Sequence, residues 1–286
     1  MSIRFTKMQG AGNDFVVLDG RRQEFDWQRL AAIMCDRHFG IGSDGLLVLL
    51  ASHAADYKMR MFNPDGSEAE ACGNGLRCLA RYVTDILRPG STPAGIRLET
   101  LAGVRHIQPI AKGDRVVEFQ VNMGQPRFEP DQIPIDRRQA KFDIIPIVDH
   151  MLSVDGTKLK VTCVSMGNPH AVSFIDGPVA DFALSQVGPL VEHHALFPKR
   201  TNFEIGHVVG QDAVEARVWE RGAGETLACG SGACAIGVAW RLRREAGSRL
   251  EVKLPGGTLK VDWDGRGDVL LTGTISLVLP VTSAAT

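Results

Sequence analysis

Two of the six cysteines lie in copies of one short motif, and this motif suits acid/base chemistry at a carbon atom. Cys72 lies in Ala-Cys-Gly-Asn-Gly, and Cys229 lies in Ala-Cys-Gly-Ser-Gly. Apolar residues at helical spacing follow both motifs and predict helices over 76–87 and 233–245. Each cysteine is therefore expected at or just before a helix N-terminus. Unpaired N–H groups and the macrodipole there stabilise a thiolate and can hold a substrate carboxylate.

Two equivalent thiols indicate a two-base reaction rather than a single nucleophile. If a pseudo-twofold axis brings the helix starts together across a cleft between domains, Cys72 and Cys229 meet opposite faces of a substrate. One thiolate then removes the α-proton of an amino acid, and the other thiol delivers a proton to the opposite face. The helix N-termini would stabilise the developing carbanion in a site closed to water. The sequence has no pyridoxal-type lysine motif and no nucleotide-binding glycine loop in a βαβ context, so we expect no cofactor.

The other four cysteines fit a structural role. Cys78 and Cys234 fall within the predicted helices, and Cys35 and Cys163 fall in a helix and a strand. Free cysteines at such positions are usually small buried hydrophobic residues. A zinc site would need clustered CxxC or HxxxH spacing, which the chain does not offer, so we expect no metal. A redox-sensing dithiol made of the two motif cysteines is a minor alternative.

Other pairs of segments resemble each other at nearly the same distance. The turns at Asn13 and Asn168 are 155 residues apart (168 − 13), and the two motif cysteines are 157 apart (229 − 72). An acidic, glycine-containing turn precedes each cysteine, over 63–68 and 220–225. Three pairs in the same order indicate two copies of one domain, with a boundary near residues 122–125.

Short strands and few helices are predicted in both copies, with turns at the many glycines. The clearest strands are expected at 14–19, 56–63, 115–122 and 213–219. A weaker helix is expected at 27–39.

The composition is that of a globular protein, at 44% hydrophobic and 23% charged residues. A formal net charge of -1 provides no positive field for nucleic acid or an anionic membrane, so we expect neither as a partner. The start of the chain lacks the apolar core of a signal peptide, and the apolar run at 46–51 is too short to cross a bilayer. Sparse cysteines fit a reducing compartment, so we expect a cytoplasmic location.

The chain resembles the diaminopimelate epimerase family over essentially its whole length. The segments that carry the resemblance are Gln9–Phe15, Asn63–Glu68, Ala71–Cys78, Met166–His170, Asn202–Phe203, Glu220–Thr226 and Ala228–Gly232. The resemblance implies an isomerase that needs no cofactor, pyridoxal phosphate included. It also implies the interconversion of LL- and meso-2,6-diaminopimelate, a small-molecule substrate, in lysine and peptidoglycan synthesis.

The resemblance also implies a homodimer and an α+β fold of the α/β type with pseudo-symmetry. Two homologous domains are expected, each a mainly antiparallel β-sheet wrapped around a central helix. The N-terminal epimerase domain should cover 1–122, and the C-terminal epimerase domain should cover 123–272. The last strand, 273–286, should return to the N-terminal domain.

The family's site residues can be transferred to matching positions of this sequence. Cys72 and Cys229 become the catalytic pair, and His170 and Glu220 become the residues that tune the thiols. The substrate-binding residues become Asn13, Asn63, Gly73, Asn74, Asn168, Asn202, Glu220, Arg221, Gly230 and Ser231. Physically, the guanidinium of Arg221 can hold a distal carboxylate through two parallel hydrogen bonds.

One position departs from some family members, and two related families remain as alternatives. Gly45 stands where others carry a substrate-contacting glutamine, so only the backbone is expected to serve there. The alternative enzyme is a proline or hydroxyproline racemase, whose substrates have one carboxylate. The pair Glu220 and Arg221 favours a longer substrate. A phenazine-synthesis-like relative is disfavoured by the cysteine pair.

Overall fold

The computed structural model divides into two compact units. Unit 1 comprises Met1–Asn122 and Thr272–Thr286, and unit 2 comprises Met123–Leu271. The residues that the structure describes are 2–69, 72–90, 94–113, 115–139, 144–243 and 247–285. Ala71 of the first cysteine motif and Glu245 at the predicted end of the second helix lie outside the described residues.

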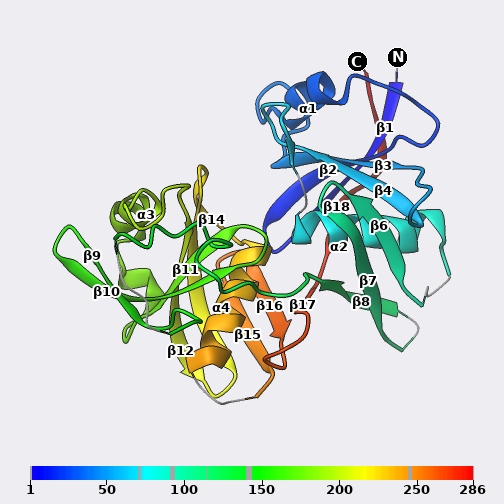
Figure 1. Cartoon of the computed structure of the whole chain (residues 1–286). Coiled ribbons are helices and arrows are strands. Elements are labelled where there is room, and N and C mark those ends of the chain that lie inside the picture. Colours follow the sequence, from blue (N-terminus) through cyan, green and yellow to red (C-terminus); the bar gives the residue numbers. More distant parts are fainter. Residues whose placement is uncertain are drawn as a thin grey trace. The chain divides into compact units, whose positions relative to one another are not determined.

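Unit 1 consists mostly of short strands (Figure 1). Its strands are β1 (Ser2–Gly10), β2 (Asn13–Asp19), β3 (Gly45–Leu50), β4 (Tyr57–Phe62), β5 (Glu68–Ala69), β6 (Ile96–Thr100), β7 (Gly103–Lys112), β8 (Arg115–Asn122) and β18 (Ser276–Ala285). Its helices are α1 (Trp27–Cys35) and α2 (Gly73–Tyr82), and a π-helical turn, Val83–Leu87, continues α2.

The strands of unit 1 pair mainly antiparallel around α2. The antiparallel pairs are β1 with β2 and β18, β3 with β4, β4 with β5, β6 with β7, and β7 with β8. The pairs β2 with β3 and β4 with β6 are parallel. Helix α2 packs against β1, β2, β7 and β8, and its residues from Gly73 to Ala80 are buried. Strand β3 is apolar throughout, since Leu46–Leu49 are buried on both faces.

Unit 2 repeats this order of elements (Figure 1). Its strands are β9 (His150–Val154), β10 (Thr157–Ser165), β11 (Pro169–Phe174), β12 (Asn202–Gly210), β13 (Ala213–Glu220), β14 (Gly224–Thr226), β15 (Arg249–Leu254) and β16 (Gly257–Asp262). Its helices are a 3-10 turn (Val179–Asp181), α3 (Leu184–Glu192) and α4 (Gly230–Arg243). Strand β17 (Leu270–Gly273) contains the second division between the units.

The strand pairing of unit 2 matches that of unit 1. Strands β9 and β10, β10 and β11, β12 and β13, β13 and β14, and β15 and β16 pair antiparallel. Strands β11 and β12, and β13 and β15, pair parallel. Helix α4 packs against β10, β11, β12, β15 and β16. The expected α+β class, with a mainly antiparallel sheet around a central helix in each unit, is therefore confirmed.

The helix boundaries correct three expectations. Helix α1 ends at Cys35 instead of reaching Phe39, because the carboxylate of Asp36 accepts N–H bonds from His38 and Phe39 at 2.7 Å and closes a turn. Helices α2 and α4 begin three residues earlier than expected, at Gly73 and Gly230, because the motif glycines themselves form the first turns.

Helix α3 was not predicted, because its sequence contains two poor helix formers. Gly188 and Pro189 lie inside it. A Cβ atom at Gly188 would lie 2.5 Å from the ring of Trp219, so the helix packs closely on that indole. Tertiary packing outweighs the local preference here. Among the described helices, none is long and apolar enough to span a membrane.

Candidate active site

Cys72 lies at the start of α2 in unit 1. It is the N-cap residue, with an extended backbone (φ -138, ψ 122), and its carbonyl accepts the N–H of Leu76 at 2.9 Å. The predicted position at a helix N-terminus is confirmed. A Cβ atom at Gly75 would lie 3.0 Å from Leu47 and 3.7 Å from the Cβ of Cys72, so this glycine allows the first turn to pack closely on β3.

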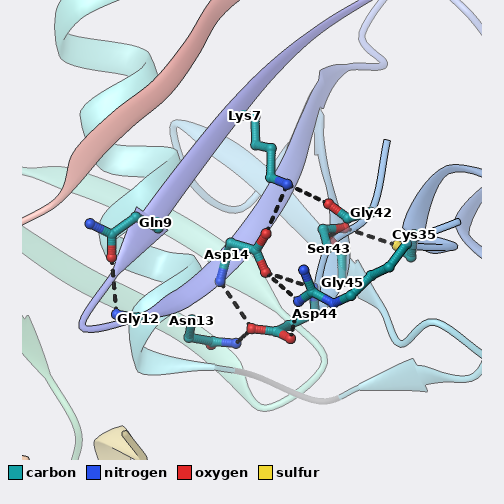
Figure 2. Close-up of polar contacts among 11 residues, drawn as sticks. Lys7, Gln9, Gly12, Asn13, Asp14, Cys35, Gly42, Ser43, Asp44 and Gly45 are labelled. Atoms are coloured by element: carbon teal, nitrogen blue, oxygen red, sulfur yellow. Dashed lines mark hydrogen bonds and ion pairs between the residues drawn. The ribbon is translucent and has the colours of Figure 1, made fainter. Parts of the chain in front are cut away.

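Two asparagine amides connect Cys72 to charged groups on either side; we call these residues the Cys72 half-site. Asn13 Oδ1 lies 3.8 Å from Cys72 Sγ and accepts from Asn74 Nδ2 at 3.3 Å. At one end, Arg77 Nη2 donates to Asn74 Oδ1 at 2.5 Å. At the other end, Asn13 Nδ2 donates to Asp44 Oδ2 at 2.8 Å (Figure 2). Because Arg77 can only donate and the carboxylate of Asp44 accepts, both amides are oriented and an acceptor faces Cys72.

The carboxylate of Asp44 belongs to a charged cluster at the edge of unit 1 (Figure 2). Arg37 bonds both Asp44 and Asp14 at 2.8 Å, and Lys7 pairs with Asp14 at 2.9 Å and donates to the carbonyl of Gly42. Burial opposes ionisation of Asp14, but hydrogen bonds from Arg37 and Lys7 outweigh it and lower the Asp14 pKa. The cluster anchors the loop before β3 to the start of β2.

Gly45 occupies a position with no room for a side chain. A Cβ atom there would lie 2.9 Å from the carbonyl oxygen of Phe62 and 3.4 Å from the ring of Phe15. Its own carbonyl accepts from the hydroxyl of Ser43 at 3.0 Å. A glutamine at this position would need the surrounding strands to shift, so only the backbone of Gly45 is available to a ligand.

Cys229 lies directly before α4 in unit 2, and hydrogen-bond donors face its sulfur; we call its surroundings the Cys229 half-site. The N–H of Gly232 donates to Sγ at 3.4 Å, and the Ser231 hydroxyl lies 3.4 Å from Sγ. Burial and the charge of Glu220 raise the pKa of Cys229 well above its ordinary value, while the bonds from Ser231 and Gly232 oppose the rise. A positive charge near the thiol would also oppose this rise.

A chain of polar side chains leads from Cys229 to a buried carboxylate. Asn168 Nδ2 donates to Ser231 Oγ at 3.4 Å, and Asn168 Oδ1 lies 3.0 Å from His170 Nε2. His170 Nδ1 lies 2.7 Å from Glu204 Oε1. Both His170 and Glu204 are 0% exposed. Burial raises the pKa of Glu204, and the imidazole of His170 opposes this rise.

The remaining residues expected in unit 2 form a second group around one turn. Asn202 Oδ1 accepts the backbone N–H of Arg221 at 2.9 Å, and its Nδ2 donates to the carbonyl of Pro169 at 2.7 Å. Thr226 Oγ1 donates to Glu220 Oε1 at 2.6 Å. This group adjoins the Cys229 half-site through Pro169, which lies between Asn168 and His170.

Asn63 is the one expected residue of unit 1 whose recorded side-chain bond stays within its own turn. It follows β4, and its amide donates to the Ser67 hydroxyl at 3.0 Å. The structure thus brings Cys72, Asn13 and Asn74 together by hydrogen bonds and places Asn63 in a separate turn.

A sequence model of the family described as diaminopimelate epimerase matches residues 5–129 and 162–278 of this chain. The chain belongs to the diaminopimelate epimerase family.

Relatives carrying that name are similar over nearly the whole chain. A diaminopimelate epimerase of Desulfovibrio desulfuricans is 47% identical over 281 residues, covering 96% of this chain and 95% of the relative. One of Acetivibrio thermocellus is 45% identical over 273 residues, covering 95% of each. The chain is therefore an isomerase.

Solved structures share the fold at low identity. A phenazine biosynthesis protein of the PhzF family from Bacillus anthracis has a TM-score of 0.70 at 16% identity, and all of both chains is covered. A probable proline racemase from Agrobacterium radiobacter has a TM-score of 0.68 at 15% identity, covering 99% of this chain and 93% of that structure. These likenesses show the fold alone.

Sequence reasoning missed four charged residues that hold the half-sites of this family member. Asp44 and Arg77 fix the amides near Cys72, and Glu204 contacts His170. Glu192 of α3 accepts from the indole of Trp219 at 2.8 Å and from the Gly222 N–H at 2.9 Å, and so holds the turn after Glu220. Only Glu204 had a usable signal, because it lies two residues after Asn202 on one strand and so shares its face.

Proposed function

We propose that this enzyme interconverts LL- and meso-2,6-diaminopimelate by a two-thiol mechanism without a cofactor. The observation that carries the proposal is that each of two matching units places one motif cysteine at the start of its central helix. Membership of the diaminopimelate epimerase family, with relatives that carry that name at 42–47% identity, supports the substrate. We also propose that units 1 and 2 are the two homologous epimerase domains.

In the proposed reaction, Cys72 and Cys229 meet opposite faces of the α-carbon. One thiolate takes the α-proton and becomes a thiol, while the other thiol gives its proton to the opposite face and becomes a thiolate. The N–H groups at the starts of α2 and α4, beginning with Gly73 and Gly230, hold the α-carboxylate and stabilise negative charge that develops on it. In the reverse direction the two sulfurs exchange roles.

The turn after β13 is proposed to hold the other end of the substrate. In this proposal the guanidinium of Arg221 binds the distal carboxylate. Asn202 and Glu220 bind the ammonium groups of the substrate or hold the backbone of the turn that carries Arg221. Glu220 also lies near enough to Cys229 to raise its pKa. Asn63 and Asn168 are proposed as further polar contacts to the substrate.

Chiral analysis of diaminopimelate and of proline, incubated separately with the protein, tests the substrate. We expect LL- and meso-diaminopimelate to reach a mixture from either side and proline to stay unchanged. Inversion of proline with no change in diaminopimelate would show that the racemase alternative is correct.

Single alanine variants test the two-thiol mechanism. Cys72→Ala and Cys229→Ala should each slow epimerisation by about 100-fold or more, since a positioned acid or base contributes roughly that factor. Cys78→Ala is the matched control in the same helix as the first motif, and it should keep most of the activity. Full activity in either motif variant would rule out the mechanism.

Two further properties remain predictions. A homodimer is expected, and sedimentation velocity would detect it. A cytoplasmic location with roles in lysine and peptidoglycan precursor synthesis is also expected, and loss of the enzyme should then deplete meso-diaminopimelate.

A further inference from the structure

The two units can be compared residue by residue through their parallel strand pairs. In unit 2, His170 of β11 lies opposite Asn202 of β12. In unit 1, Phe15 of β2 lies opposite Gly45 of β3. His170 is therefore equivalent to Phe15, with the same offset of 155 (170 − 15) as the paired asparagines.

Glu204 has an equally clear equivalent. Glu204 lies two residues after Asn202 on β12, and Leu47 lies two residues after Gly45 on β3. Glu204 is therefore equivalent to Leu47, with the same offset of 157 (204 − 47) as the cysteines. Both lie against the first turn of the central helix: a Cβ atom at Gly75 would lie 3.0 Å from Leu47 Cδ2, and one at Gly232 would lie 2.9 Å from Glu204 Oε1. Unit 2 thus has a carboxylate where unit 1 has an apolar side chain.

The fold itself does not require this polar pair. Phe15 and Leu47 are 0% exposed, as are His170 and Glu204, so the same two buried places are filled by apolar residues in one unit and by ionisable residues in the other. A buried ion pair is generally no more stabilising than apolar residues of similar volume. An ionisable pair at these two positions of unit 2, where unit 1 has Phe15 and Leu47, therefore indicates a chemical role near Cys229.

We propose that Glu204 is a positioning residue of the Cys229 half-site, which holds His170 with both ring nitrogens acting as donors. This rests on the proposed function for its link to catalysis. His170 Nδ1 faces Glu204 Oε1 at 2.7 Å, and Nε2 faces Asn168 Oδ1 at 3.0 Å. An imidazole that donates from both nitrogens is an imidazolium.

The carboxylate is well placed to hold that charge. Glu204 Oε2 is buried and has no hydrogen-bond partner among the residues that the structure describes. The imidazolium of His170 and the N-terminal end of α4 at Gly232 are therefore the groups that compensate the negative charge. Glu220 also acts electrostatically on Glu204, but the carboxylate of Glu204 is the one recorded in contact with the His170 ring. Removing it takes away the contact that balances a positive charge in a fully buried place.

The consequence for Cys229 follows from a proton balance. The neutral arrangement has a thiol at Cys229 and one N–H on the His170 ring. When Sγ loses a proton and the His170 ring gains one, a thiolate and an imidazolium form and the net charge is unchanged. In that arrangement Asn168 Nδ2 donates to Ser231 Oγ, and the Ser231 hydroxyl donates to the sulfur. Glu204 favours it by balancing the imidazolium, so Cys229 is prepared to act as the base.

The first test observes the His170 ring directly. In protein labelled with ¹⁵N-histidine, the wild type should show both ring nitrogens of His170 protonated at neutral pH, with the signals assigned by their loss in His170→Gln. Glu204→Gln keeps the shape and an acceptor, and should convert one ring nitrogen to the unprotonated form. A neutral ring in the wild type, or the same two protonated nitrogens in both proteins, would overturn the proposal.

The second test measures whether alkylation of Cys229 becomes faster or slower in Glu204→Gln than in the wild type. Removal of a negative charge near Cys229 would by itself favour the thiolate and speed alkylation by iodoacetamide. Loss of the imidazolium partner should instead slow alkylation. The expected slowing is about tenfold if the pKa of Cys229 rises by one unit, because the thiolate fraction then falls by that factor. Peptide-resolved mass spectrometry reads Cys72 in the same sample as an internal reference, expected to change by less than about twofold. Faster alkylation of Cys229, or equal slowing at both cysteines, contradicts the proposal.

Matched variants separate positioning from folding. Glu204→Asp keeps the carboxylate and should restore part of the alkylation rate and of kcat, whereas a purely steric role would make it as poor as Glu204→Gln. Glu215→Gln on the neighbouring strand β13 is the control and should match the wild type in both tests. The ¹⁵N-histidine and alkylation measurements do not depend on the epimerase reaction. If the wild type proved inactive on diaminopimelate, the proposed function would be refuted, and these two measurements would still decide the role of Glu204.

Discussion

The Cys72 half-site and the Cys229 half-site begin alike and differ in what faces the sulfur. Both cysteines start the central helix of their unit, after matching strands. Cys72 faces the acceptor Asn13 Oδ1 at 3.8 Å, whereas Cys229 faces the N–H of Gly232 and the hydroxyl of Ser231 at 3.4 Å. An acceptor suits a thiol that donates a proton, and donors suit a thiolate, so these contacts favour different protonation states at the two sulfurs.

Each unit also has a charged side chain that is 0% exposed, Arg77 in unit 1 and Glu204 in unit 2, at positions that are not equivalent. Arg77 of unit 1 corresponds to Cys234 of unit 2 (234 − 77 = 157), and both are fully buried. Glu204 of unit 2 corresponds to Leu47 of unit 1. Two units with matching strand pairing can therefore keep the same core positions while each has a buried charge at a different position.

The largest effect is expected from the turn after β13. In unit 2 this turn contains the charged side chain of Arg221, whereas the matching turn of unit 1 contains the uncharged amide of Asn63. Arg221→Met should weaken the use of diaminopimelate by about 2–5 kcal/mol in kcat/KM, because a charge-assisted contact to the distal carboxylate is lost. Steady-state kinetics on both stereoisomers measures the effect.

A surface arginine provides the control for this prediction. Arg249→Met removes an exposed partner of Asp262 and should leave kcat/KM unchanged. Wild-type kinetics in Arg221→Met would mean that the distal carboxylate binds elsewhere, and a shorter amino acid would then become the better substrate.

The second prediction concerns the buried cation of the Cys72 half-site. Arg77→Met leaves Asn74 Oδ1 buried without its donor, so the free energy of unfolding should fall by about 1–3 kcal/mol. Urea titration measures it. Arg81→Met, on the same helix, breaks a pair with Asp85 near the surface and should cost less than about 1 kcal/mol. Equal losses in the two variants would show that Arg77 has no special role in the half-site.

The smallest effect concerns the interior thiols, which have no part in the comparison of the half-sites. Burial raises the pKa of Cys163 to about 12 and also raises that of Cys78. A thiol with a raised folded pKa stabilises the fold below its unfolded pKa, and this stability is lost as pH rises from about 9 toward 12. Between pH 8 and pH 10 the wild type should lose about 1 kcal/mol more than Cys163→Ala.

Thermal or urea unfolding at the two pH values checks the sign of this change. Cys78→Ala should flatten the dependence of stability on pH in the same way. If the slope is unchanged in both alanine variants, burial does not suppress ionisation of these thiols.

The sequence was most informative where chemistry depends on neighbours along the chain. Helical periodicity after the two Ala-Cys-Gly motifs placed Cys72 and Cys229 at helix starts, because glycines and apolar spacing act within a single turn. The strands at Ala213–Glu220 and Arg115–Asn122 were also predictable, since alternation reports a half-buried strand. Repeated order at offsets of 155 and 157 indicated two copies, and the fixed offsets hold again at residues that sequence reasoning did not use.

Contacts between distant residues were decided only by the tertiary structure. Asn13 meets Asp44, and His170 meets Glu204, because parallel pairing of β2 with β3 and of β11 with β12 sets a register that no local pattern encodes. The end of α1 at Cys35 and the existence of α3 likewise depend on side chains that compete with or outweigh helix propensity. The sequence by itself determined where the thiols lie along the chain, whereas packing across strands determined which groups surround them.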